Sequence, residues 1–417
     1  MAKAKRKSSV VEAEILIVGG GLAGGAMAAA LAQAGISVCV VDVLDPREGL
    51  DAGFDGRASA IALATQRVLH GIGVWPLLGN HPAPIEDIRV SEDDSLLFLH
   101  YDHREVGTEP FGFMVENRHM RQALFSRLDQ LEQVQQLAPA QIMRLERGPS
   151  GAVAELADGR QILARLVIGA DGRGSRTRAD AGIDVTKWSY NQFGIVCSVE
   201  HELSHDFTAH EHFLPAGPFA ILPLMGNPAQ PGHWSSIVWT ERTDVTPAIM
   251  ALDDAGFHEE LMSRFGDFLG ATRVVGPRWS YPLGLQFSET CIAERLALIG
   301  DASHAMHPIA GQGLNMGLRD VAVLAEVMSD ARRLGLDLGD GVALERYQRW
   351  RRFDNTMMLA ATDVLNRLFS NRIEPLRLAR DLGLAAVNRM PPVKKIFMRQ
   401  AMGLTGELPR LMRGEAL

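Results

Sequence analysis

Residues 15–24 read ILIVGGGLAG, and this stretch decides the fold. Its first four residues are apolar and rich in β-branched side chains, which is typical of a buried parallel strand. The glycines that follow have the spacing GxGxxG, at Gly19, Gly21 and Gly24. An alanine-rich segment with the composition of a helix comes next, and Gly35 is placed to end it.

The GxGxxG spacing predicts a turn that binds the pyrophosphate of a dinucleotide. Gly19 allows a tight turn, Gly21 lets a phosphate approach the backbone, and Gly24 lets the helix pack closely on the strand. The start of the helix offers free N–H groups to the phosphates. A second apolar strand over residues 37–41 ends at Asp42, an acid placed to accept from a ribose hydroxyl. The alternative is a glycine-rich turn in an unrelated α/β protein.

Two further strand-like runs end in a Gly-Asp or Gly-Ala-Asp pattern. Residues 165–178 read RLVIGADGRGSRTR and include Asp171, and residues 296–304 read LALIGDASH and include Asp301. The second run leads to GQGLNMG at residues 311–317, a glycine-flanked helix start whose N–H groups suit an anionic or electron-rich ring. A carboxylate at the carboxyl end of a strand is placed to bind sugar-like hydroxyls.

These motifs, in this order and approximate spacing, resemble the single-component FAD-dependent aromatic hydroxylases of the p-hydroxybenzoate hydroxylase type. The resemblance extends over residues from about 13 to 365. Further segments resemble the ubiquinone-biosynthesis hydroxylases, the 2-polyprenyl-phenol hydroxylases of that group. They are GRASAIAL at residues 56–63, VENR at 115–118, HPIAGQGLNMGLRD at 307–320, and the ending MGL with LPRLMRG within 402–414.

The resemblance implies which residues hold the cofactor. They are Gly19, Gly21, Gly24, Asp42, Arg57, Arg118, Asp171, Asp301, Gly311, Gly313, Leu314 and Asn315. Asp301 would bind the ribitol or the nearby phosphates, and the N–H groups from Gly313 to Asn315 would face the flavin pyrimidine carbonyl. Pro308 would lie beside the ring where oxygen reacts, and it is the one residue assigned to the catalytic site. The resemblance implies no metal, and no acid or base residue is assigned.

The same resemblance implies an NAD(P)H-consuming monooxygenase that hydroxylates an aromatic ring through a flavin C4a-hydroperoxide. Its substrates would be O2 and a polyprenyl-phenol or quinone precursor of ubiquinone. No second GxGxxG follows, which fits transient binding of NADH or NADPH and does not distinguish them. The hydroperoxide decays in water, so the pocket must exclude solvent.

Two other functions stay open at this point. One is a flavin-dependent reductase or dehydrogenase of a prenyl lipid, which would need no oxygen. The other is a non-catalytic FAD-binding scaffold that assembles other ubiquinone-biosynthesis proteins.

The predicted fold is α/β, with a Rossmann-like FAD-binding domain of the p-hydroxybenzoate hydroxylase type (GR2). Its segments are residues 1–80, 100–182 and 288–365. An inserted, mostly antiparallel β-sheet domain for the substrate is expected from residues 81–99 and 183–287, where strand-like alternation occurs at 89–99, 193–199, 219–224 and 234–240. Residues 366–417 are expected to form a helical, basic C-terminal segment. The substrate pocket is expected between the inserted sheet and the flavin.

The charge of the chain is −8, which argues against a nucleic-acid partner. That charge is uneven, because residues 366–417 contain ten basic and four acidic residues, a net +6. This segment is either a solvated helical cap or a surface that touches an anionic membrane. We predict a cytoplasmic protein with peripheral contact at the inner face of the membrane. No apolar run reaches the roughly 18 residues that a membrane span needs.

Three features admit other roles. Cys39, Cys197 and Cys291 lie too far apart in sequence for a zinc site, so we expect small buried hydrophobes in a reducing compartment. His304 and His307 with Asp301 could form an iron site, but the glycine pattern already explains the segment, and packing or a place in the cofactor shell is favoured for the histidines. Residues 200–212, rich in histidine and acid, are expected to be a solvated connection, and residues 1–10 a solvated tail.

Overall fold

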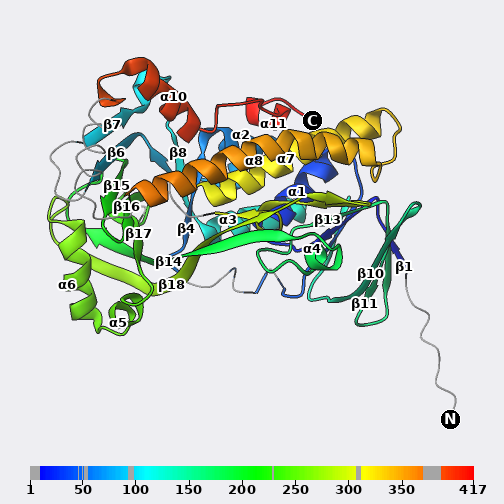
Figure 1. Cartoon of the computed structure of the whole chain (residues 1–417), viewed down its shortest axis with the longest axis horizontal. Helices are drawn as coiled ribbons and strands as arrows, with labels where there is room; N and C mark the ends of the chain where they lie inside the picture. The colour runs from blue at the N-terminus through cyan, green and yellow to red at the C-terminus, as the bar shows by residue number, and fades with distance from the viewer. Residues whose placement is uncertain are drawn as a thin grey trace, which may run out of the picture.

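The structure is a computed structural model, and it describes residues 10–45, 47–48, 50, 55–92, 98–227, 230–306, 311–369 and 387–417. Two large sheets dominate it, one mostly parallel and one mostly antiparallel, with long helices lying across them (Figure 1). This confirms the predicted α/β class with an inserted antiparallel sheet and helices toward the C-terminus.

The mostly parallel sheet carries the first motif. Its strand order is β19-β20-β13-β2-β3-β9, with β2 at Ile15–Val18, β3 at Val38–Val41, β9 at Val134–Leu137, β13 at Leu166–Gly169, β20 at Leu296–Leu298 and β19 at Ile292–Ala293. All neighbours are parallel except β19 with β20. The four strands from β20 to β3 are almost entirely buried, which explains why their sequences are continuous apolar runs.

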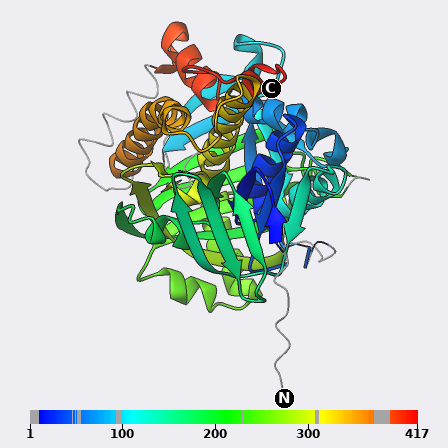
Figure 2. The same cartoon turned by 90° about the vertical axis from the view of Figure 1, so that its right-hand side faces the viewer.

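Helices and a small sheet enclose these strands. The core of this unit is shared with α1 (Leu22–Gln33), α3 (Asn117–Leu128) and α7 (Gln312–Arg333). It also includes inward residues of the sheet β1-β12-β11-β10, with bounds Val10–Glu12, Gln161–Ala164, Gly151–Leu156 and Ile142–Gly148. Figure 2 looks onto the end of the molecule that carries this sheet. The alanines of α1 leave little side-chain bulk, so this helix packs closely against its neighbours.

The larger sheet has the order β21-β18-β14-β17-β16-β15-β6-β7. Its strands are β6 (Asp87–Glu92), β7 (Phe98–Asp102), β14 (Val185–His201), β15 (Thr208–Leu214), β16 (Gly217–Leu224), β17 (Trp234–Arg242), β18 (Thr272–Ser288) and β21 (His304–Ala305). All its pairs are antiparallel except β15 with β6. One face forms an apolar core with α5 (Thr246–Met250) and α6 (Asp254–Phe265), whose buried members include Ile195, Trp239 and Phe257.

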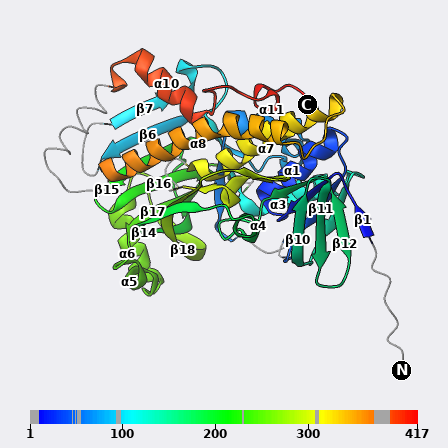
Figure 3. The same cartoon turned by 45° about the vertical axis from the view of Figure 1, so that its right-hand side comes forward.

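The remaining elements connect these bodies. A three-stranded sheet has the order β4-β8-β5, at Ala58–Ala62, Gly112–Glu116 and Ala83–Ile85. The other helices are α2 (Leu63–Gly71), α4 (Arg176–Asp180), α8 (Gly341–Phe369), α10 (Pro391–Ala401) and α11 (Arg410–Arg413), with short 3-10 turns at Trp75–Leu78, His103–Glu105 (η2) and Gly300–Ala302 (η3). In Figure 3, α8 lies along α7, and α10 lies beside β6 and β7. No helix in the described part of the chain is long and apolar enough to span a bilayer.

Three expectations need correction. The strand-like run at 89–99 is not one strand, because it holds the end of β6 and the start of β7, which pair antiparallel; residues 93–97 lie outside the described part. Residues 200–212 are not a solvated connection, because they belong largely to β14 and β15, and His201 and His205 are buried. Val10 is not in a free tail, because it lies in β1 and pairs with Gln161 of β12. Residues 1–9 lie outside the described part.

Candidate functional site

Gly19 and Gly24 need to be glycine for packing reasons, and Gly21 does not. Gly19 has a φ of +101°, and a Cβ there would lie 2.4 Å from the carbonyl oxygen of Ala170. A Cβ at Gly24 would lie 1.9 Å from the carbonyl oxygen of Gly19. A Cβ at Gly21 would meet no protein atom within 4 Å, so this glycine faces open space.

The start of α1 is available to an anion. Gly21 is its N-cap residue and provides no side chain to accept from the first N–H groups. Asp42 stiffens the loop, because its Oδ2 accepts from the Gly20 N–H at 2.6 Å and its Oδ1 accepts from the Leu44 N–H at 3.0 Å. A helix start without a side-chain cap and a backbone that can be approached closely at Gly21 together fit the pyrophosphate of FAD.

The three glycine motifs meet at one edge of the parallel sheet. The first follows β2, the second follows β13 and the third follows β20, and these strands are neighbours with parallel registers. The carboxyl ends of parallel strands lie at the same edge, which is where ligands bind in such sheets. A direct bond also joins the second and third motifs, because an Arg178 Nη1–H donates to the carbonyl of Ala302 at 2.8 Å.

The two motif carboxylates have different surroundings. Asp171 accepts from the Ser175 hydroxyl at 2.5 Å and from the Thr177 N–H and hydroxyl at 2.9 Å. It therefore holds the turn that begins α4. Asp301 lies in η3 and is exposed, so its carboxylate faces outward at the edge where the motifs meet.

The start of α7 is tied to β4 by Asn315. Its Nδ2 donates to the carbonyls of Ala60 at 2.9 Å and of Gly311 at 3.2 Å, and its Oδ1 accepts from the Ala62 N–H at 2.9 Å. Gly311 has a φ of +62°, and a Cβ there would lie 2.8 Å from the Ala60 Cβ. Gly313 faces open space. Leu314 packs against the large core, and Pro308 lies outside the described residues.

The two predicted arginines lie at the ends of paired strands. β4 pairs with β8 so that Ala58 is opposite Glu116, which places Arg57 and Arg118 near each other in the fold. Arg57 pairs with Asp55 at 2.6 Å and lies over the ring of Trp279, 5.3 Å from its centre. Arg118 pairs with Glu116 at 2.7 Å. These two sequence segments, far apart along the chain, thus form one wall beside the start of α7.

A buried ionic cluster under the third motif was missed from the sequence. Asp320 on α7 is fully buried, and it accepts from the Gly300 N–H at 2.9 Å, from Arg351 Nε at 2.6 Å and from His304 Nε2 at 2.7 Å. Burial opposes ionisation of Asp320, but His304 and Arg351 outweigh it and lower its pKa. The cluster fixes the turn that presents Asp301. The available signal was an acid in the apolar stretch that follows the third motif.

The other candidate ligands have structural surroundings. His304 is buried against Asp320, as the favoured packing role requires, and His307 lies outside the described residues. Within the described part of the chain, no three His, Cys, Asp or Glu side chains are grouped to hold a metal ion. The expectation that the cysteines are buried is confirmed, and burial raises the pKa of Cys39, Cys197 and Cys291 to about 12 each.

Known proteins share this architecture. The FAD binding domain family matches residues 12–349. The chain is 56% identical over 408 residues to the ubiquinone hydroxylase UbiL of Rhodospirillum rubrum, an alignment that covers 97% of this chain and 94% of that protein. It is 36% identical over 393 residues to the 3-demethoxyubiquinol 3-hydroxylase of Escherichia coli, with 94% and 98% covered. The solved structure of p-nitrophenol 4-monooxygenase PnpA from Pseudomonas putida superimposes with a TM-score of 0.78 at 18% identity, covering 96% of this chain and 99% of that one.

The fold and the three joined motifs define a flavoprotein of the aromatic-hydroxylase type. The chain belongs to the FAD binding domain family, together with the ubiquinone hydroxylases it resembles. It is an FAD-dependent monooxygenase with NADH or NADPH as its reductant, as the motifs predicted. The described residues at the sheet edge fit the cofactor that this family binds.

Proposed function

We propose that this protein hydroxylates the aromatic ring of a prenylated phenol or quinone precursor in ubiquinone biosynthesis. The observation that carries the proposal is the 56% identity to a ubiquinone hydroxylase over nearly the whole chain. The site geometry supports it, because each family motif lies at the one sheet edge where FAD would bind. We expect it to act on the cytoplasmic side of a membrane, alongside other proteins of the same biosynthesis.

The residue roles proposed here are those that the resemblance to the family implies. Bound FAD, once reduced by NADH or NADPH, would supply the activated oxygen. The turn from Gly19 to Gly24 and the start of α1 would hold its pyrophosphate, and Asp42 its ribose. Asp301 would bind the ribitol, and the N–H groups from Gly313 to Asn315 would hold the flavin carbonyl. Arg57, Arg118 and Asp171 would shape the surroundings, and Pro308 would line the reaction side of the ring.

In the proposed domain division, FAD binds to a domain formed by residues 1–80, 100–182 and 288–365. The substrate would then belong to residues 81–99 and 183–287, and its pocket would lie between the large sheet and the flavin. Three of the strands that support this division, β14, β16 and β17, are adjacent in the large sheet. A pocket between two bodies excludes water better than an open surface, which the oxygen chemistry requires.

The test is a single turnover. The FAD-loaded protein is reduced by NADH or NADPH without oxygen, given a 2-prenylphenol and then mixed with air, and the product is identified by mass spectrometry. We expect a phenol with one added oxygen atom. Peroxide alone, with every prenylphenol tried, contradicts hydroxylation. Turnover that is the same under strict anaerobiosis favours a reductase. Normal complementation by an Asp301→Ala variant that no longer binds FAD favours a scaffold.

We also propose that α10 touches an anionic membrane. Its outer side chains Ile396 and Phe397 are 63% and 48% exposed, and Met390 just before it is 52% exposed. Residues 387–401 contain no acid, and the exposed charges beside the apolar side chains are Arg389, Lys395 and Arg399. Apolar side chains ringed by cations are the pattern of a helix that lies in an anionic lipid interface. These three cations are among the ten basic residues of the C-terminal segment.

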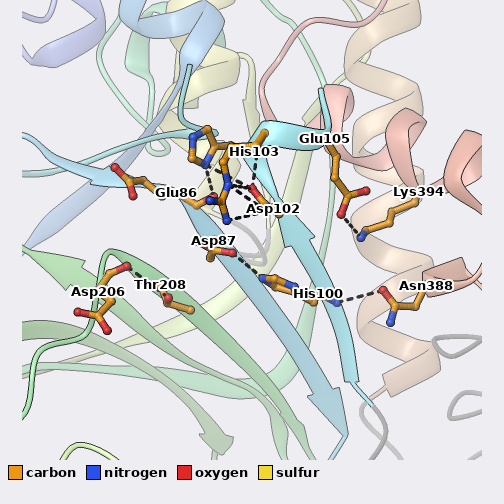
Figure 4. A network of polar contacts seen from close by, with 11 residues as sticks. Glu86, Asp87, His100, Asp102, His103, Glu105, Asp206, Thr208, Asn388 and Lys394 are labelled. Atoms are coloured by element: carbon orange, nitrogen blue, oxygen red, sulfur yellow. Dashed lines mark hydrogen bonds and ion pairs between the residues drawn. The ribbon is translucent and has the colours of Figure 1, made fainter. Parts of the chain in front are cut away.

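Contacts on the protein-facing side of α10 and at its ends hold the helix in place, and they do not involve Ile396 or Phe397. Lys394 Nζ donates to Glu105 Oε1 at 2.5 Å, and Asn388 Oδ1 accepts from the His100 N–H at 3.5 Å (Figure 4). Met398 and Met402 are buried in an apolar cluster that includes Phe111 on the body of the protein. The outer side chains are therefore dispensable for docking the helix.

Flotation with vesicles tests this contact. The full chain should float with equal parts of phosphatidylglycerol and phosphatidylcholine, and far less with phosphatidylcholine alone. Removing two large apolar side chains by Ile396→Ser with Phe397→Ser should lower the bound-to-free ratio about tenfold or more. The control Leu334→Ser with Leu336→Ser changes two exposed leucines at the other end of the molecule and should leave binding unchanged. Equal binding by the α10 variant counts against the proposal.

A further inference from the structure

The two faces of the large sheet differ in what they touch. Ile195, Cys197 and Ile237 point into the core with α5 and α6. The opposite face lies against the segment that leads into β4. Trp279 on this face donates from Nε1 to the Asp55 carbonyl at 2.5 Å, and a Cβ at Gly56 would lie 4.0 Å from the Ser198 hydroxyl.

This opposite face adjoins the proposed flavin site. Ala209 on β15 is buried in the cluster against which Ala58 and Ala60 of β4 pack. The carbonyl of Ala60 accepts from Asn315 at the start of α7. Because side chains alternate along a strand, Glu211 lies on the same face of β15 as Ala209.

Glu211 lies in an apolar row across the sheet. The strand registers set side by side Val90 of β6, Glu211 of β15, Ala220 of β16, Val238 of β17 and Val196 of β14. A carboxylate among such neighbours is poorly hydrated. Burial accordingly raises the pKa of Glu211 to about 7.

Two buried hydroxyls flank this row on the same face. The register places Ser198 in the next row on one side and Thr240 in the next row on the other. Both residues are at most 1% exposed, and within the described part of the chain neither hydroxyl oxygen has a hydrogen-bond partner. Native proteins rarely leave such groups unpaired, so a polar ligand group is expected here.

Other ionisable side chains lie around this face, and Tyr281 of β18 is neutral because burial raises its pKa. Tyr101 of β7 lies one row away, and burial raises its pKa to about 12, which keeps it neutral. Glu92 of β6 lies one row away on the other side and is buried. Lys394 of α10 is paired with Glu105, and Arg57 with Asp55.

We propose that Glu211 binds the ring hydroxyl of the phenolic substrate and accepts its proton as oxygen is transferred. The O–H bond of the phenol breaks, and its electron pair stays on the phenol oxygen. That charge enriches the ring carbon, which would form a C–O bond as the O–O bond of the oxygen supplied through reduced FAD breaks. The second oxygen atom would leave as water, taking up the proton displaced from that ring carbon and one proton from the reduced cofactor. The proton moves to a carboxylate oxygen of Glu211 and returns to the product oxygen afterwards, so the carboxylate is restored. Ser198 and Thr240 provide further hydrogen bonds to the polar head of the substrate.

This proposal rests on the proposed hydroxylation, so its test separates binding from turnover. Glu211→Leu removes the carboxyl and fits the apolar row, and Glu211→Gln keeps an acceptor but cannot take up the proton. Glu200→Gln, which changes a partly exposed carboxylate of β14 that is paired with Arg273, is the control. The probes are 2-geranylphenol and its methyl ether, with affinities measured by isothermal calorimetry on the FAD-loaded protein.

The unmodified protein should prefer the phenol to its methyl ether by about tenfold or more, because a hydrogen bond to a carboxylate is strong. Glu211→Leu should abolish this preference, and Glu200→Gln should keep it. This comparison needs no turnover, so it stands even if hydroxylation is not found. A preference that survives in Glu211→Leu overturns the proposal.

Turnover gives the second readout. Hydroxylation by the unmodified protein should rise as the pH rises through about 7, where Glu211 becomes ionised. Glu211→Gln should be slower by roughly a hundredfold and lose this rise, while the control Glu200→Gln should keep both the rate and the rise. An unaltered pH profile in Glu211→Gln overturns the proton-accepting role.

Discussion

At the residue scale, we expect Asp320 to support both the stability of the fold and the turn of the third motif. It is fully buried and carries the negative charge that meets His304 and Arg351, while it also holds the Gly300 N–H. Breaking a buried ion pair leaves the partner charge uncompensated, which costs about 3–5 kcal/mol.

Asp320→Asn should therefore lower the free energy of unfolding by about 3–5 kcal/mol and weaken FAD retention. Urea unfolding and the flavin content after gel filtration measure the two effects. The control Asp180→Asn changes an exposed acid paired with Arg176 and should alter stability by less than about 1 kcal/mol. An Asp320→Asn protein as stable as the control would show that the cluster does not support the motif.

At the scale of elements, two glycines at the start of α1 have different roles, one in packing and one in the proposed binding of FAD. Gly24 is in contact with the backbone of Gly19, whereas Gly21 faces open space at the helix start. The φ of Gly21 is −66°, which alanine adopts without strain. A glycine-to-alanine substitution should thus have different effects at Gly21 and at Gly24.

Gly24→Ala should fail to fold or lose most of its stability, because its Cβ would overlap a carbonyl oxygen that cannot move aside. Gly21→Ala should keep its melting temperature without FAD and bind FAD at least about tenfold more weakly, because the methyl group occupies the approach of the pyrophosphate. Circular dichroism and quenching of flavin fluorescence distinguish the two. Normal FAD affinity in Gly21→Ala would move the pyrophosphate away from this turn.

At the scale of the whole molecule, FAD would join segments that are far apart in the sequence. Its proposed ligands lie in the turns after β2, β3, β13 and β20 and at the start of α7, so the bound cofactor should stabilise the folded chain against unfolding.

Removing FAD should lower the melting temperature, by an amount that grows with the logarithm of the ratio of free FAD to its dissociation constant. With free FAD at a hundred times its dissociation constant, the stabilisation is about 2.7 kcal/mol. Differential scanning fluorimetry across an FAD titration checks this, with adenosine as a control ligand that lacks the flavin and the pyrophosphate. A melting temperature independent of FAD would show that the folded chain does not bind FAD in preference to the unfolded chain.

The sequence alone determined the features that depend on local chemistry. The strand at Ile15–Val18, the glycine spacing that follows and the acid at Asp42 are short-range patterns, and each has the conformation expected of it. The spacing of glycines around a phosphate is set by backbone geometry, so it indicated a dinucleotide site. The FAD-dependent hydroxylase class came from the resemblance of the three ordered motifs to a known family.

Only the tertiary structure decided which distant residues meet. The pairing of Asp320 with His304 and Arg351 depends on how α7 and α8 pack on η3. The place of Glu211 in an apolar row depends on the register of five strands, and a shift of one residue would turn it to the other face. Alternation along a strand shows that two faces exist, but the rest of the fold decides which face is turned to the proposed flavin site.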